Sequence, residues 1–269
     1  MPSRRMHAPG PFRADQLRSK DPYELSDGHA IRVLPTGSRG GDAQAVAGAI
    51  VRTDPAVKHA GVDVGYSPDE RTLRAPDVSV IPGTPGRGWV EDVPPFAIEY
   101  ADVGQDEEKL QEKIHDLVGR GTRYLWVVRL EGPRRVEVWT AEGCRVATSG
   151  EILEAPGVLQ NPVPVDALYD PELGLELALK NLLERFGYRD VDAIREEGRA
   201  EGRAEGRAEG RAEGRADGLR VVVLASFERR GIEVSPAARA VIDAADADTL
   251  LRWALDAPTV SDPAELISR

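Results

Sequence analysis

Alternating and periodic apolar residues divide the first part of the chain into short strands and one helix. Residues 23–25 and 29–34 alternate between apolar and polar side chains, and the Ser-Asp-Gly turn between them is typical of a β-hairpin. Residues 42–54 carry alanine and valine at helical spacing, which predicts a helix on one face of a sheet. Residues 62–66 predict a further strand.

Two strands predicted in the middle of the chain each carry one carboxylate. In residues 77–81, Asp77 lies on one face and the two valines lie on the other. In residues 96–101, Glu99 shares its face with two alanines, which leaves room beside it for a metal ion and a phosphate. A Pro-Asp step alone is more often a strand-entry turn. A glutamate inside an apolar run, however, needs a partner, because a buried carboxylate is costly by itself.

A helix predicted over residues 106–119 follows these strands. Lys113 lies at the margin of its apolar stripe, where the stem can lie on the sheet and the amine can reach a site beyond the strand end. Taken alone, Lys113 would be interpreted as a solvated helix lysine. Together with Asp77 and Glu99 it predicts a metal-dependent phosphodiesterase site. Two carboxylates can hold Mg²⁺ (or Mn²⁺), and a lysine can orient or deprotonate the attacking water.

The remaining apolar runs of this region complete a sheet. Residues 122–128 form a dense apolar run that is typical of a central strand, and residues 135–139 pair with it across a Gly-Pro turn. Residues 144–148 predict one more strand. The order of elements predicts an α/β domain over residues 21–170, with a mixed β-sheet flanked by helices.

The C-terminal part of the chain is predicted to be helical. Residues 171–190 contain an amphipathic helix, residues 191–218 a Glu-Gly-Arg-Ala repeat, and residues 219–269 a small helical domain. Each glycine costs about 1 kcal/mol in a helix interior, so the repeat is unstable as an isolated helix. It is therefore either a helix that pairs with the glutamate and arginine columns of another copy or a flexible, solvated spacer. Residues 1–20 are expected to be a flexible N-terminus.

Composition and charge limit the classes of function and the cellular location that are compatible with the sequence. The net charge is −11, whereas proteins that bind nucleic acids are usually basic, which argues against a simple DNA-binding role. The acidity is spread over the chain, because residues 1–190 carry 23 basic and 30 acidic side chains and residues 191–269 carry 12 and 16. The single cysteine, Cys144, suits a reducing cytoplasm. No apolar run approaches the roughly 20 residues of a membrane span, so we expect a cytoplasmic protein without a membrane partner.

Four short motifs over about residues 20–170 contain the candidate site residues. They are Tyr23-Glu24-Leu25 with Gly28, Pro76-Asp77-Val78-Ser79-Val80, Phe96-Ala97-Ile98-Glu99, and Lys113 with Gly121, Tyr124 and Trp126. With them the chain resembles the PD-(D/E)XK nuclease superfamily and, within it, the bacterial Uma-type restriction endonuclease family. The resemblance implies a restriction-endonuclease-like fold and Mg²⁺-dependent cleavage of DNA. It implies Asp77 and Glu99 as metal ligands, Lys113 as the catalytic lysine displaced from a strand to a helix, and Glu24 as an additional acid.

The chain departs from that pattern at two positions. The superfamily places its lysine two residues after the glutamate, where this chain has Ala101. Members of the family often have a serine three residues after the glutamate, where this chain has Asp102. Asp102 either joins the site or marks a drift away from activity.

These observations lead to hypotheses of two classes. The first is a Mg²⁺-dependent endonuclease that hydrolyses DNA, and the same site would also permit action on RNA or nucleotides. The second is a catalytically inactive nuclease-fold scaffold, or an oligomerising DNA-associated protein, in which the repeat joins copies as a coiled coil. The net charge and Ala101 motivate this second hypothesis. In both cases we expect a homo-oligomer.

Overall fold

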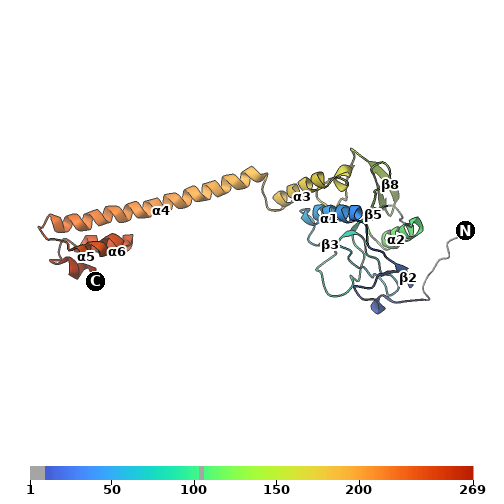
Figure 1. Ribbon diagram of the computed structural model, residues 1–269, viewed down its shortest axis with the longest axis horizontal. Helices are drawn as coiled ribbons and strands as arrows, with labels where there is room; N and C mark the ends of the chain where they lie inside the picture. Colours follow the sequence, from blue (N-terminus) through green and yellow to red (C-terminus); the bar gives the residue numbers. More distant parts are fainter. Residues whose placement is uncertain (1–9, 103–105, 269) are drawn as a thin grey trace. The chain divides into compact units, whose positions relative to one another are not determined.

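A mixed six-stranded sheet forms the centre of the first of two units in this computed structural model, which describes residues 10–102 and 106–268 (Figure 1). The strand order is β3-β4-β5-β6-β7-β8. β5 and β6 are parallel, and all other neighbours in the sheet are antiparallel. The strands are β3 (Ala60–Val62), β4 (Val78–Val80), β5 (Phe96–Ala101), β6 (Tyr124–Arg129), β7 (Arg135–Thr140) and β8 (Gly143–Thr148). This architecture confirms the predicted α/β fold with a mixed sheet.

Helices cover both faces of this sheet. α2 (Glu107–Gly119) is the crossover between β5 and β6, because parallel neighbours cannot be joined by a tight turn. Its leucines and isoleucine pack on Ala97 and Ala101. On the opposite face, α1 (Ser38–Thr53) packs against Phe96, Ile98 and Tyr100 of the same strand, and α3 (Pro171–Arg185) packs against α1. Alternate side chains of β5 therefore belong to the two hydrophobic cores on opposite faces of the sheet, as the alternation of residues 96–101 predicts.

Smaller elements close the ends of the first unit. β1 (Tyr23–Ser26) and β2 (His29–Arg32) form the predicted hairpin, and its two turn residues both have positive φ, 45° and 78°. The remaining elements are η1 (Ala14–Gln16), β9 (Ile152–Leu153), β10 (Val163–Pro164) and η2 (Val165–Leu168). Ala14 packs with Leu25 and Leu73, so ordered structure begins before residue 21. Residues 1–9 of the expected flexible N-terminus lie outside the described part.

The predicted strand over residues 62–66 is wrong. β3 ends at Val62, because Asp63 adopts a positive φ of 51° that breaks the extended chain. Tyr66 forms only isolated bridges, to Arg74 and Val90. Asp77 likewise lies just before β4 and not inside it.

The second unit, Val191–Arg269, consists of helices. They are α4 (Val191–Glu228), α5 (Pro236–Ala244), α6 (Ala247–Asp256) and α7 (Pro263–Ile267). The last turns of α4 supply Val223 and Phe227 to a core that includes Ile242, Leu250 and Trp253. The repeat is an uninterrupted part of α4, and its pairing with another copy stays a prediction. Within the described residues, no helix is long and apolar enough to cross a membrane.

Candidate functional site

The amine of Lys113 lies among the acidic residues that the sequence selects. Nζ lies 2.7 Å from Glu99 Oε1 and 3.0 Å from Glu24 Oε1, and it donates a 2.7 Å hydrogen bond to the carbonyl of Ala75. The side chain is 13% exposed, so Lys113 is not a solvated helix lysine. Burial lowers the pKa of Lys113, but the carboxylates of Glu24, Glu99 and Asp77 raise it by more, and the amine is therefore held in its charged form.

The start of α2 fixes the position of Lys113 along the helix. Asp106 is the N-cap, and its carboxylate accepts a hydrogen bond from the backbone N–H of Lys109. Two glutamates in the first turn, Glu107 and Glu108, suit the positive end of the helix dipole. Leu110, Ile114 and Leu117 then anchor the helix on the sheet, and Lys113 emerges beside this anchor. The position at the stripe margin is what the sequence predicts.

Glu99 lies in β5 on the face that α2 covers. Its side chain is 8% exposed. Oε1 is buried and forms an ion pair with Lys113 Nζ at 2.7 Å. Burial raises the pKa of Glu99 to about 8, and this effect outweighs the lowering by Lys113. This acid is therefore not fully compensated by the lysine.

Asp77 is brought to Glu99 by the register of the sheet. Val78 of β4 pairs with Ile98 of β5, so the residue before Val78 lies opposite the residue after Ile98. Asp77 Oδ2 accepts a 2.6 Å hydrogen bond from the backbone N–H of Tyr100. Burial raises the pKa of Asp77, while Lys113 and the hydrogen bond from Tyr100 oppose this shift. The two acids thus lie on one face of the sheet.

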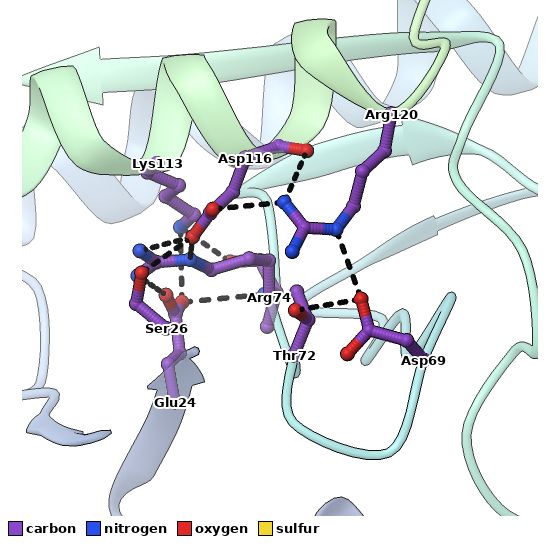
Figure 2. A network of polar contacts seen from close by, with 9 residues as sticks. Glu24, Ser26, Asp69, Thr72, Arg74, Lys113, Asp116 and Arg120 are labelled. Atoms are coloured by element: carbon purple, nitrogen blue, oxygen red, sulfur yellow. Dashed lines mark hydrogen bonds and ion pairs between the residues drawn. The ribbon is translucent and has the colours of Figure 1, made fainter. Parts of the chain in front are cut away.

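Glu24 comes from β1, outside the main sheet, and belongs to a buried network that also contains Arg74 and Asp116. Figure 2 shows Lys113 and Asp116 extending from α2 toward Arg74 and Glu24. Glu24 Oε2 pairs with Arg74 Nη1 at 3.1 Å, and Oε1 accepts a 3.2 Å hydrogen bond from the N–H of Ala75. Asp116 Oδ2 accepts three hydrogen bonds, from Arg74 Nε (2.8 Å), Arg74 Nη2 (2.7 Å) and Ser26 Oγ (2.8 Å).

Arg74 is not among the site residues predicted from the sequence, although this residue joins β1 to α2. Its side chain is only 1% exposed, and it connects an acid of β1 to an acid of α2. Asp116 Oδ1 continues the network outward to Arg120 at 3.0 Å, which in turn bonds Asp69 (Figure 2). An arginine just before the Pro-Asp motif was a usable signal, because its neighbours are apolar and a buried arginine needs acidic partners.

The four predicted site residues line one open cavity of about 670 Å³. Basic side chains of the same cavity surround the acids: Arg32 from β2, Arg39 from α1 and Lys109 from α2. Arg39 Nη2 bonds Asp102 Oδ1 at 2.8 Å, so Asp102 lines the cavity as the partner of an arginine. A lining that contains both acids and cations suits a phosphate ester bound against a metal ion.

The residues present fit a divalent cation. Asp77, Glu99 and Glu24 face one lysine, and both Asp77 and Glu99 have raised pKa values because their negative charge is buried in excess. Among the described residues no three His, Cys, Asp or Glu side chains converge on one point as a metal cage. Mg²⁺ does not require one, since it is commonly held by one or two carboxylates and keeps several waters.

The structure has no room for a lysine at position 101, where the superfamily pattern has one and this chain has Ala101. Ala101 is 4% exposed and packs against α2 on the same face as Ala97. A lysine at this position would displace the helix that brings Lys113 to the acids. The lysine that contacts Glu24 and Glu99 is therefore supplied by α2.

Comparisons with known proteins agree with this architecture. The model of the Uma2 family, described as "Putative restriction endonuclease", matches residues 12–166. No curated protein matches the chain. Among solved structures, the chain is similar to "a putative nuclease belonging to DUF820 from Anabaena variabilis ATCC 29413", with a TM-score of 0.51 and 17% identity over 59% of this chain and 98% of that one. At this identity the similarity shows the fold alone.

Proposed function

Because this chain belongs to the Uma2 family, we propose that it hydrolyses phosphodiester bonds of DNA in the presence of Mg²⁺ or Mn²⁺. One observation carries the proposal. A helix-borne amine lies 2.7 Å from Glu99, and Asp77 lies opposite that glutamate in the sheet, so residues far apart in sequence meet in one cavity. Asp77 and Glu99 are the proposed metal ligands.

Each side chain has a distinct role in the proposed reaction. A divalent cation, when bound, activates water and offsets charge on the phosphate. Lys113 stays protonated because its pKa is raised, so it donates hydrogen bonds to the attacking water or to a phosphate oxygen and does not act as a base. Glu24 keeps the amine in place from the β1 side. Arg32 and Lys109 are placed to contact the phosphates that flank the reacting one.

The proposal includes DNA as the partner and the cytoplasm as the location. The family description names a restriction endonuclease, which supports DNA over RNA. A protein that cleaves DNA must be in the compartment that contains the DNA, which in bacteria is the cytoplasm. The free cysteine Cys144 suits that reducing compartment. We also propose that the protein is a homo-oligomer.

Plasmid cleavage tests the proposal. We expect wild-type protein to nick or linearise supercoiled DNA with Mg²⁺ or Mn²⁺ and to lose all cleavage in EDTA. Glu99→Gln removes one proposed ligand and is expected to lower the rate by at least about 10²-fold. Glu112→Gln, an exposed position on α2, is the matched control and should cleave as wild type does. Cleavage of a labelled RNA of the same sequence, measured beside cleavage of the DNA, decides whether the substrate is DNA or RNA.

Two results would contradict the proposal. Cleavage by Glu99→Gln at the wild-type rate would remove this glutamate from the site. Absence of cleavage by the wild-type protein on plasmid and genomic DNA under all divalent metals would favour the inactive scaffold.

A further inference from the structure

The glutamates and arginines of the repeat in α4 have no partners within their own helix. Residues 197–216 contain five copies of Glu-Gly-Arg-Ala, and all of these residues except Ala216 are exposed. Glutamate and arginine are two or six residues apart, which places them on opposite sides of a helix. Within the repeat, the neighbours at three and four residues from either charged residue are glycine, alanine or a residue of the same charge. Accordingly, no ion pair occurs inside this segment in the described structure, although Arg195–Asp192 and Arg220–Asp217 pair just outside it.

The repeat arranges these charges into columns that wind slowly around the helix. Successive residues are about 100° apart around a helix, so the four residue types form four columns in the order glutamate, glycine, arginine, alanine. The glycine column therefore has glutamates along one side and arginines along the other. A β-carbon built on any glycine from Gly198 to Gly214 meets no atom within 4 Å, so this column is open.

This arrangement distinguishes the two ways of pairing two copies. When two identical helices run parallel with glycine columns facing, the glutamate side of each meets the arginine side of the other. When they run antiparallel, glutamates meet glutamates and arginines meet arginines. Opposite charges attract and like charges repel across such an interface, so the sequence favours the parallel pair.

The period of the repeat determines the handedness with which two such helices wind around each other. Four residues exceed the 3.6 residues of one turn, so each column advances by about 40° per repeat around the helix. A partner that follows the column must wind around it with a right-handed twist. Glycine at every fourth position is the pattern that permits close, right-handed crossing of two helices.

The first unit carries an independent indication of a protein interface. On α3, Leu175, Leu179, Leu182 and Phe186 are between 37% and 70% exposed. Their spacing of four, three and four residues is the seam of a coiled coil, which is normally covered by another helix. An exposed apolar row of this length indicates a protein interface.

We propose that two copies of this chain associate in parallel along the repeat of α4, with glycine columns in contact and each glutamate column against an arginine column of the partner. The proposal concerns assembly and does not rest on the catalytic role. Salt weakens the association, because most of its specificity comes from exposed charges.

Sedimentation equilibrium of the full-length protein tests the charge columns. We expect a wild-type dimer whose dissociation constant rises at least tenfold in an all-glutamate variant, made by Arg→Glu at 199, 203, 207, 211 and 215. The complementary all-arginine variant, Glu→Arg at 197, 201, 205, 209 and 213, should be weakened equally. Mixing the two should restore a heterodimer. A monomeric wild type, or an all-glutamate variant with the wild-type dissociation constant, would overturn the proposal.

Two further variants test the contact face and the direction. Gly206→Gln should weaken the dimer, whereas Ala208→Gln on the opposite side of the helix should not. Glutamine is a better helix former than the glycine it replaces, so a loss of helix cannot explain a weaker Gly206→Gln dimer. In a Cys144→Ser background, Gly198→Cys and Gly214→Cys should each form disulfides with an identical chain. Cross-links that form only when the two variants are mixed would show an antiparallel pair and contradict the proposal, as would equal effects of the two glutamine substitutions.

Discussion

Replacing Lys113 with methionine is expected to lower the rate of metal-dependent DNA cleavage by about 10²–10³-fold, the loss typical of removing one donor that stabilises charge developing in the transition state. Methionine keeps an unbranched stem but removes the charge that lies 2.7 Å from Glu99 and 3.0 Å from Glu24. Single-turnover cleavage of a supercoiled plasmid, with protein in excess, measures the effect separately from product release.

The matched control for this substitution is Lys180→Met. Lys180 is an exposed lysine of α3 and does not line the cavity, so its loss should leave the rate unchanged. Lys113→Arg separates charge from geometry, because a guanidinium keeps the charge but cannot occupy the same narrow position. A Lys113→Met protein that folds and cleaves within threefold of wild type would remove Lys113 from the reaction.

Arg74→Met is expected to destabilise the first unit by about 3–5 kcal/mol, because two buried carboxylates lose the cation that they share and each keeps only one basic partner, Lys113 for Glu24 and Arg120 for Asp116. Arg74 is 1% exposed, and its partners Glu24 and Asp116 are 7% and 9% exposed. For a domain of this size the loss corresponds to a melting temperature lower by roughly 6–20 °C. Thermal unfolding followed by circular dichroism in EDTA measures it without interference from bound metal.

Arg71→Met provides the control for the stability prediction. Arg71 lies three residues earlier, is 52% exposed, and pairs with Asp27 at 3.0 Å. Exposed ion pairs contribute only about 0–1 kcal/mol, so this variant should unfold close to wild type. Adding Asp116→Asn to Arg74→Met should recover part of the loss, because it removes a buried charge that has only Arg120 left as a partner. Equal stability of Arg74→Met and Arg71→Met would show that the buried network does not hold β1 to α2.

Much of the candidate site could be predicted because its residues interrupt apolar patterns. Glu99 stands inside a buried strand, and Lys113 stands at the edge of an apolar helix face, so each residue is placed by its neighbours. The family resemblance adds Glu24, which no local pattern selects. The family match and the mixed sheet confirm the resemblance and the fold class, while the roles of these residues stay predictions.

The remaining features depend on contacts that a linear pattern does not contain. Arg74 lies in a segment without regular periodicity, and its burial follows from the meeting of β1 with α2, which are far apart in sequence. Asp63 belongs to an alternating run, yet its positive φ ends β3 there. The repeat has low helix propensity because of its glycines, but it continues the helix that Val223 and Phe227 anchor in the second core.

The central claim is that Asp77 and Glu99 hold one divalent cation beside the amine of Lys113. A crystal soaked with Mn²⁺ and measured at its absorption edge tests this directly, because the anomalous signal locates the ion independently of any activity. We expect an anomalous peak between the two carboxylates that is absent in Asp77→Asn crystals. A peak elsewhere in a protein that cleaves DNA, or a cavity without a peak at saturating Mn²⁺, would contradict it.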